Sequence, residues 1–326
     1  VNAKRTYAIK KIAAEHRLAL TGTPVENNLT ELWSIYDFLM PGYLGTLKRF
    51  KKDYIDDTEN GPARLRRIVA PFLLRRVKKE VLLELPDKQE QVSWCKLHPV
   101  QEKLYLQVID TVQKKLLHSP EAAQLNFVNV LAALTKLRQI CNHPHLADPD
   151  ILPEPEASSK LELLIELVED AMGSGHKILV FSQFVQMLKI IRQVFDNMNL
   201  NYAYMDGKSK NTLQEVRRFE NNPELQLFLI SLKTGGTGLN LTAADTVILY
   251  DPWWNPMVEN QAIDRTHRIG QTHKVQVYRL ITKGTVEEKI MNLQQHKLKL
   301  FDEVVSDTRK FLSNLTPEEI RDLFTY

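Results

Sequence analysis

Residues 177–181 read KILVF, and this short apolar run sets the pattern for the rest of the chain. Similar runs follow it, separated by longer stretches with apolar residues at helical spacing. That alternation is typical of a parallel β-sheet with crossover helices, and it predicts an α/β domain. We expect strands at 177–181, 202–204, 225–230, 246–250 and 275–280, with helices near 183–197, 209–220 and 256–268.

Other segments predict helices outside this sheet. Residues 100–118, 122–140 and 161–171 have helical periodicity, and 286–305 has the length and composition of a long helix. The proline-rich stretch 144–155 predicts a loop. We also expect a short strand running into a turn at 16–24, and a last short helix beginning near Thr316.

Composition narrows the class of protein. The chain has 326 residues and a net charge of +3, too small to indicate a nucleic-acid partner by itself. No apolar run approaches the roughly 20 residues of a membrane helix. Cys95 and Cys141 are too few for a disulfide framework and favour a reducing compartment. The start at Val1 suggests that the sequence begins inside a longer chain.

Basic residues are concentrated in the stretch 48–79. They would form either a binding surface or solvated helix faces.

The segment 261–271 carries the residues most suited to phosphate chemistry. On a helix, Arg265 and Arg268 would share a face and point two guanidinium forks at one anion. The alternative is a pair of surface arginines bound to Asp264 or Glu259, which for an isolated Arg-x-x-Arg is the commoner case.

Two further segments follow predicted strands. Lys233, Thr234 and the neighbouring glycines form a turn that could aim N–H groups at a phosphate, but it lacks the Gly-Lys-Ser/Thr ending of a Walker A loop. Trp253 and Trp254 could stack on a nucleic acid or pack in the core, and core packing is the commoner fate of tryptophan.

Metal sites find little support in the sequence. Cys141, His143 and His145 are potential ligands without a partner pair at zinc-finger spacing, so we expect no metal site there. The sequence has no Walker A motif, and its Asp302-Glu303 pair lies in a predicted helix rather than after a strand.

Taken together, the motifs resemble the Swi/Snf family of superfamily-two helicase-like ATPases over nearly the whole chain. The segments that carry the resemblance are LTGTP at 20–24, PFLLRR at 71–76, QICNHP at 139–144, and residues 177–184, 233–245 and 261–271. The family's first two motifs are not in the sequence, and the C-terminus resembles that of compact bacterial members.

The resemblance implies a function for individual residues. Arg265 and Arg268 would be arginine fingers in ATP hydrolysis. Nucleotide contacts would come from Gly236, Gly238, Gln261 and Asp264. DNA contacts would come from Thr23, Ser182, Gln183, Gly207, Lys233, Thr234, Gly235 and Trp254.

The resemblance also implies a domain order. It predicts the end of a first RecA-like lobe at 1–45, a basic helical segment and linker at 46–94 and a helical protrusion at 95–157. A second RecA-like lobe with a parallel sheet and flanking helices would occupy 158–284, followed by a brace helix and tail at 285–326.

The expected activity is ATP-driven translocation on double-stranded DNA, of the chromatin-remodeller type and without sequence preference. ATP and Mg²⁺ would bind mainly to a first lobe that precedes Val1, and this chain alone would be inactive. Protein–DNA complexes are expected targets, with no membrane partner, in the bacterial nucleoid or the eukaryotic nucleus. The rival hypotheses are a non-catalytic module that binds DNA or a protein, and a helicase that separates base pairs.

Overall fold

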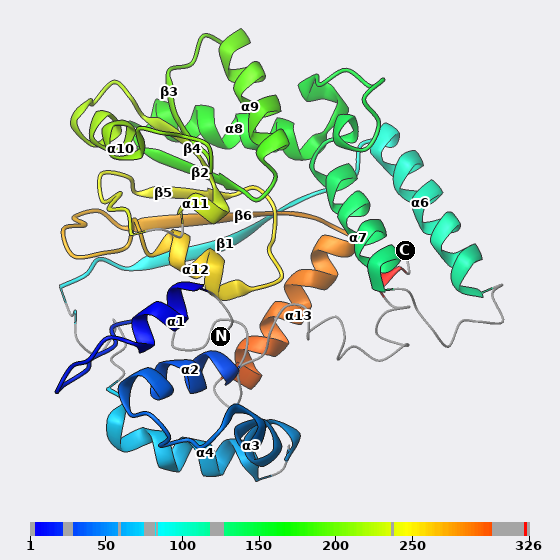
Figure 1. Ribbon diagram of the computed structural model, residues 1–326. Helices are drawn as coiled ribbons and strands as arrows, with labels where there is room; N and C mark the ends of the chain where they lie inside the picture. The colour runs from blue at the N-terminus through cyan, green and yellow to red at the C-terminus, as the bar shows by residue number, and fades with distance from the viewer. Residues whose placement is uncertain are drawn as a thin grey trace. The chain divides into compact units, whose positions relative to one another are not determined.

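In the computed structural model of the chain (Figure 1), the described residues are 4–21, 29–57, 60–74, 82, 84–117, 127–235, 238–301 and 323–324. The chain divides into two compact units, Val1–Val81 with Gln295–Leu315 and Leu82–Gln294 with Thr316–Tyr326. None of the helices in the described part of the chain has both the length and the apolar character needed to cross a bilayer.

The larger unit is built on a six-stranded sheet in the order β1-β6-β5-β2-β4-β3, and all neighbouring strands run parallel. Every strand that the apolar runs predict is present, with ends shifted by at most two residues, and the expected parallel α/β fold is confirmed. The strands are β1 (Lys88–Cys95), β2 (Ile178–Ser182), β3 (Tyr202–Met205), β4 (Leu227–Ser231), β5 (Thr246–Leu249) and β6 (Val275–Thr282).

Strand β1 is the one strand of this sheet that the sequence pattern does not predict. It reads KQEQVSWC, pairs with β6 from Lys88↔Val275 to Cys95↔Thr282, and leaves most of its side chains exposed or half-buried. An edge strand with one neighbour needs little apolar surface, so its sequence lacks the signal that marks the buried β2, β4 and β5.

Helices cover both faces of the sheet (Figure 1). One face packs against α8 (Ser159–Gly173) and α9 (Val185–Asn197). The other packs against α10 (Thr212–Asn221), α11 (Leu232–Gly235) and α12 (Pro256–Ile263). Alternation along β2 explains the division, since Leu179 and Phe181 face one cluster and Ile178 and Val180 the other.

The helical segments around the sheet also form largely as expected. They are α6 (Pro99–Leu117), α7 (Phe127–Asn142) and α13 (Val286–Phe301), and two 3₁₀ turns, Pro144–Leu146 and Pro155–Ala157, lie in the predicted loop. A fully buried ion pair joins α8 to α13, with Lys160 Nζ 2.5 Å from Glu287 Oε2. The predicted helix near Thr316 falls almost wholly outside the described residues.

The smaller unit is helical. Its helices are α1 (Lys4–Lys10), α2 (Leu29–Leu39), α3 (Leu47–Phe50), a π-helix (Lys51–Asp56), α4 (Gly61–Val69) and a 3₁₀ turn (Ala70–Phe72). The core of this unit gathers Leu32, Tyr36, Leu44, Phe50, Leu65 and Val69.

One expectation for this unit is wrong. Residues 17–21 form no strand, and Leu18 and Leu20 are 80% and 90% exposed. A strand needs a neighbour to bond its backbone, and the described residues of this unit include no other strand.

Candidate functional site

The candidate site lies at the carboxyl edge of the sheet. Because the strands are parallel, the residues that follow them emerge at one edge, where α/β sheets bind their ligands. This edge therefore brings together most of the residues predicted to contact DNA. They are Ser182 at the end of β2 and Gln183 after it, Gly207 after β3, Lys233, Thr234 and Gly235 after β4, and Trp254 after β5.

A buried network holds the turn after β2. Asp251 accepts hydrogen bonds from Ser182 Oγ at 2.5 Å and from the Gln183 N–H at 3.1 Å. Ser182 is only 1% exposed. Its hydroxyl is therefore turned toward Asp251, and Gln183, which is half-buried, is the side chain of this turn that reaches the surface.

Arg138 of α7 completes this network. Its guanidinium donates to Gln183 Oε1 at 2.8 Å and to the Pro252 carbonyl at 2.7 Å, and it lies 3.5 Å from Asp251 Oδ2. The rings of Phe184 and Trp253 lie 5.0 and 5.4 Å from its Cζ. Burial raises the pKa of Asp251 to about 6, while Arg138 and the Ser182 hydroxyl act in the opposite direction.

The sequence analysis missed Arg138 and did not single out Asp251. Arg138 is 3% exposed and lies on the face of α7 that also buries Leu134, Leu137 and Cys141. A lone arginine on an otherwise apolar helix face is a signal that sequence alone offers, since a buried charge requires a partner.

The turn after β4 is packed closely against β2. Ser231 Oγ lies 2.7 Å from Thr234 Oγ1, while Lys233 beside it is exposed. A Cβ atom on Gly235 would lie 2.5 Å from Cε1 of Phe181, so this close approach requires glycine. The predicted contacts Gly236 and Thr23 lie outside the described residues, whereas Gly238 is described and exposed.

The two tryptophans after β5 differ in exposure. Trp254 is 7% exposed and counts among the core residues, whereas Trp253 is half-buried. The backbone N–H of Trp253 donates to Glu259 Oε1 at 2.6 Å. The side chain of Asn255 caps α12 by accepting from the backbone N–H of Met257 at 3.0 Å. Packing thus accounts for the indole of Trp254, and its contact with DNA stays a prediction.

The helix expected through Arg268 ends at Ile263, so the helical premise for the two arginines is wrong. The Arg265 carbonyl accepts from the Leu241 N–H at 3.0 Å, and the Thr266 carbonyl accepts from Gln271 Nε2 at 3.3 Å. The helix gives way to tighter turns after Ile263, where the N–H groups of Arg265 and Thr266 donate to carbonyls three residues back, at Ala262 and Ile263.

The arginines nevertheless come together. Arg265 is half-buried, and its pKa is lowered by burial and then by the charge of Arg268, with Asp264 opposing both. Arg268 is exposed, and one of its terminal nitrogens donates to the Leu239 carbonyl at 3.4 Å. Two guanidinium groups that repel each other suit an anion with several oxygens, such as a phosphate, and Gln261 and Asp264 lie on the same segment.

Metal binding finds no support in the described part of the chain, where no group of three or more His, Cys, Asp or Glu side chains could hold an ion. His143 Nε2 and His145 Nδ1 contact the carbonyl oxygens of Glu154 and Ile151 at 2.9 and 2.6 Å. The described residues thus offer no cluster of carboxylates for magnesium, whereas the guanidinium groups of Arg265 and Arg268 fit the phosphates of a nucleotide.

Comparison with known families gives two matches along the chain. Residues 1–146 match the family model of the SNF2-related domain, and residues 159–270 match that of the helicase conserved C-terminal domain.

Known ATP-dependent helicases are similar to the chain over nearly its whole length. The putative ATP-dependent helicase/translocase YwqA of Bacillus subtilis is 40% identical over 337 residues, a match that covers 99% of this chain and 36% of that protein. An uncharacterized ATP-dependent helicase of Mycoplasma pneumoniae is 37% identical, and the match covers 31% of its length. The chain therefore spans about a third of these relatives.

A solved structure is similar over nearly all of the chain. It is the Sulfolobus solfataricus SWI2/SNF2 ATPase core in complex with dsDNA, 36% identical with a TM-score of 0.63 over 98% of this chain and 69% of that one.

Proposed function

Because the chain belongs to the Swi/Snf family of helicase-like ATPases, we propose that it forms the second motor lobe of an ATP-driven translocase on double-stranded DNA. The observation that carries this proposal is that Arg265 and Arg268 meet the same loop before β5, through the Leu241 N–H at 3.0 Å from the Arg265 carbonyl and the Leu239 carbonyl at 3.4 Å from Arg268, and that the charge of Arg268 lowers the pKa of Arg265.

We assign Arg265 and Arg268 to the transferring phosphoryl group of ATP. A guanidinium fork beside that group stabilises the charge that develops in the transition state. Arg265 remains charged at neutral pH despite its lowered pKa, because arginine titrates far above neutral pH. Gln261, Asp264, Gly236 and Gly238 would contact the rest of the nucleotide.

ATP and Mg²⁺ would bind mainly to a lobe on the N-terminal side of this chain. The sequence contains no Walker A motif, and the described residues include no carboxylate group suited to magnesium. The exposed Leu18 and Leu20 also support this inference, since the segment 16–20 would gain partners as a strand in the sheet of that lobe.

The carboxyl edge of the sheet would follow the DNA backbone. Lys233 and Gly207 are exposed there, and Gln183 and Thr234 are half-buried. These residues offer a charge, an amide, a hydroxyl and backbone N–H groups, which suit phosphates and sugars better than base edges. Binding would therefore be independent of sequence.

ATP turnover of this chain alone and of the full-length protein tests the assignment. We expect background rates for the chain alone and DNA-stimulated turnover for the full-length protein. Arg265→Ala or Arg268→Ala should lower turnover by roughly 10³-fold with little change in DNA affinity, and lysine should not restore it.

The matched control is Arg217→Ala, which removes an exposed arginine from α10. Robust DNA-stimulated turnover by the chain alone would contradict the division of the active site between lobes. Near-normal rates in the Arg265 and Arg268 variants would remove them from catalysis. A full-length protein that binds DNA without hydrolysing ATP would favour the non-catalytic module.

A further inference from the structure

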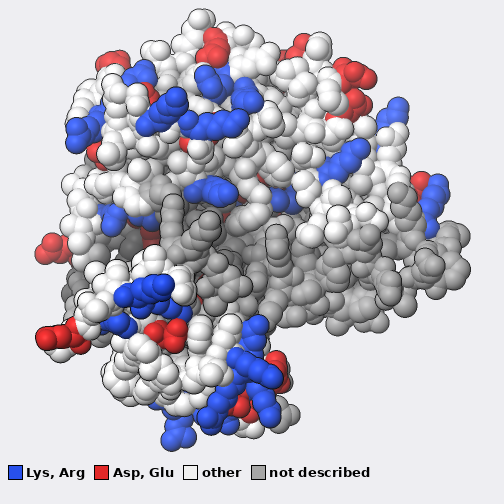
Figure 2. Space-filling model, in the orientation of Figure 1, with Lys and Arg blue, Asp and Glu red and all other residues white. Residues whose placement is uncertain are grey.

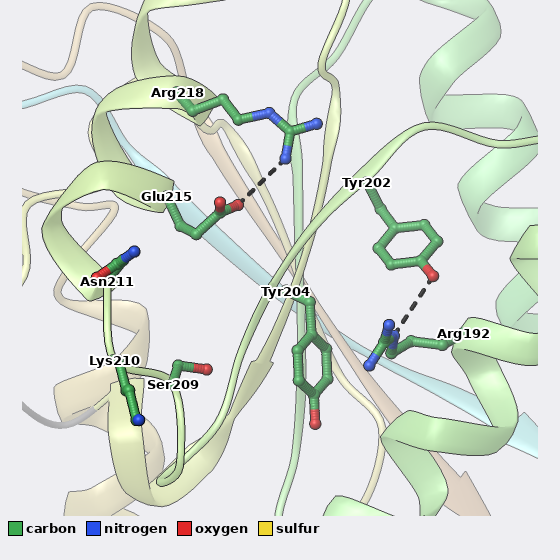
Figure 3. A pocket seen from close by; sticks show the side chains of 8 residues that line it. All are labelled: Arg192, Tyr202, Tyr204, Ser209, Lys210, Asn211, Glu215 and Arg218. Atoms are coloured by element: carbon green, nitrogen blue, oxygen red, sulfur yellow. Dashed lines mark hydrogen bonds and ion pairs between the residues drawn. The ribbon is translucent and has the colours of Figure 1, made fainter.

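A polar pocket of ≈ 390 Å³ lies beside the edge strand β3, away from the arginine pair. We call it the edge pocket (Figure 3), and the lining residues that matter here are Arg192 of α9, Tyr202 and Tyr204 of β3, Lys210, and Glu215 and Arg218 of α10. None of them is among the residues that the motifs single out.

Aromatic rings hold Arg192 in place. Its Cζ lies 4.3 Å from the ring centroid of Tyr204 and 5.9 Å from that of Tyr202, and its Nε donates to Tyr202 Oη at 3.4 Å. A guanidinium held over a ring face and bonded through Nε has its terminal N–H groups left for a planar pair of oxygens. Arg192 is therefore oriented before any ligand arrives.

The tyrosine hydroxyls are used elsewhere. Tyr202 Oη donates to Asp196 at 2.6 Å, and Tyr204 Oη donates to Asp206 at 2.8 Å. Burial, followed by the contact with Asp206, raises the pKa of Tyr204 to about 12. Tyr204 thus stays neutral and serves Arg192 as a platform rather than as a counter-charge.

The lining carries an excess of positive charge. Arg218 pairs with Glu215 at 3.3 Å, but within the described part of the chain Arg192 and Lys210 form no ion pair. Among the lining residues, three cations against one carboxylate leave a net charge of +2, and Asp196 and Asp206 lie behind the lining on the tyrosine hydroxyls. Figure 2 shows basic side chains gathered over the region of β3, α9 and α10. A ligand with several negatively charged oxygens fits this lining.

We propose that the edge pocket binds a phosphate of the DNA backbone, so that the duplex contacts continue from the carboxyl edge of the sheet around β3 to α9. This proposal rests on the proposed function, because the loop that follows β3 carries both Gly207 and Lys210. The open, cationic pocket offers an arginine fork suited to phosphate and no helix that could enter a groove to read bases.

Binding of duplex DNA by the full-length protein at several salt concentrations tests this site. The test variant is the double substitution Arg192→Ala with Lys210→Ala. The control is Lys103→Ala with Lys114→Ala, which removes the same charge from α6 outside the pocket. We expect the test variant to lower the slope of log affinity against log salt by about one unit, because one phosphate contact is lost, equally for two unrelated sequences, and the control to leave it unchanged.

Single substitutions distinguish the role of the Tyr204 ring from the role of the Arg192 charge. Tyr204→Phe keeps the ring and should bind as wild type, whereas Tyr204→Ala should weaken binding severalfold. Arg192→Lys should fall between wild type and Arg192→Ala, because the charge remains without the stacked fork. Equal effects of Tyr204→Phe and Tyr204→Ala on DNA binding would contradict the claim that the Tyr204 ring orients Arg192.

Other outcomes distinguish the two proposals. An unchanged slope in the test variant, with a lower slope in Lys233→Ala, would overturn the edge pocket and leave the DNA-binding edge intact. A slope unchanged in all of these variants would count against both. If a ten-residue polyglutamate peptide bound wild type but not the test variant while DNA binding was unaltered, the pocket would be a site for acidic peptides.

Discussion

Two groups of residues share the carboxyl edge of the sheet and differ in burial. Arg138, Ser182 and Asp251 are 3%, 1% and 2% exposed and bond one another, whereas Lys233 and Gly207 are exposed. Removing a charge from water is unfavourable unless partners replace the water, so the buried group is committed to partners inside the protein. The exposed group keeps donors available for a ligand. We infer that the buried group positions the turn after β2 and that the exposed group contacts the ligand.

The largest expected effect tests the buried group. Arg138→Ala leaves the Asp251 carboxylate without its cation, and breaking a buried pair in this way costs about 4 kcal/mol. We expect a loss of that size in the free energy of unfolding, measured in denaturant. The matched control is Arg138→Met combined with Asp251→Asn, which removes both charges and should cost less. A loss below about 1 kcal/mol in Arg138→Ala would contradict the positioning role.

Trp254 is predicted to bind DNA, yet its side chain is buried. Its substitution therefore tests whether a buried residue at this edge only packs. Replacing a buried tryptophan by alanine costs about 3 kcal/mol, which lowers the melting temperature by several degrees. If the indole only packs, Trp254→Ala should melt early and still translocate on DNA. Normal melting with ATP hydrolysis uncoupled from translocation would instead place the indole against DNA.

The pH dependence of stability tests the raised pKa of Asp251, whose ordinary value is 3.8 and whose folded value is about 6. Between these values the folded protein keeps a proton that the unfolded chain has released. The contribution of Asp251 to the free energy of unfolding is therefore full below pH 3.8 and lost as the pH rises through 6. Its slope reaches at most about 1.4 kcal/mol per pH unit.

Asp251→Asn should remove this component, as measured by denaturant unfolding at successive pH values. Arg138, Lys160 and Glu287, which also act on the pKa of Asp251, are present in both proteins, so the comparison isolates the titration of Asp251. An identical pH profile in the variant would assign the slope to other groups.

The smallest expected effect belongs to the exposed group. Lys233→Ala should lower the slope of log affinity against log salt by about one unit, because one phosphate contact is lost. Stability should be unchanged, since the side chain is exposed. A large loss of stability in this variant would remove the distinction between the two groups.

The sequence predicted the regular parts of this fold well and the irregular parts poorly. Apolar runs marked β2 to β6 because buried strands require such residues. The polar β1 gave no such signal, since its place beside β6 depends on residues far along the chain. The helix after Pro256 was predicted too long because the backbone tightens into turns after Ile263, in a segment that also bonds the distant Leu241.

The sequence alone determined the class of fold, the family and the residues that reach the carboxyl edge of the sheet. These follow from neighbours in the chain, through periodicity, motif order and the residues that come after each strand. Only the tertiary structure decided which of those residues are buried. Arg138 and Asp251 are 113 positions apart, and their pairing turns the Ser182 hydroxyl inward. Whether a polar residue at that edge is buried depends on contacts between distant segments, which the apolar runs do not record.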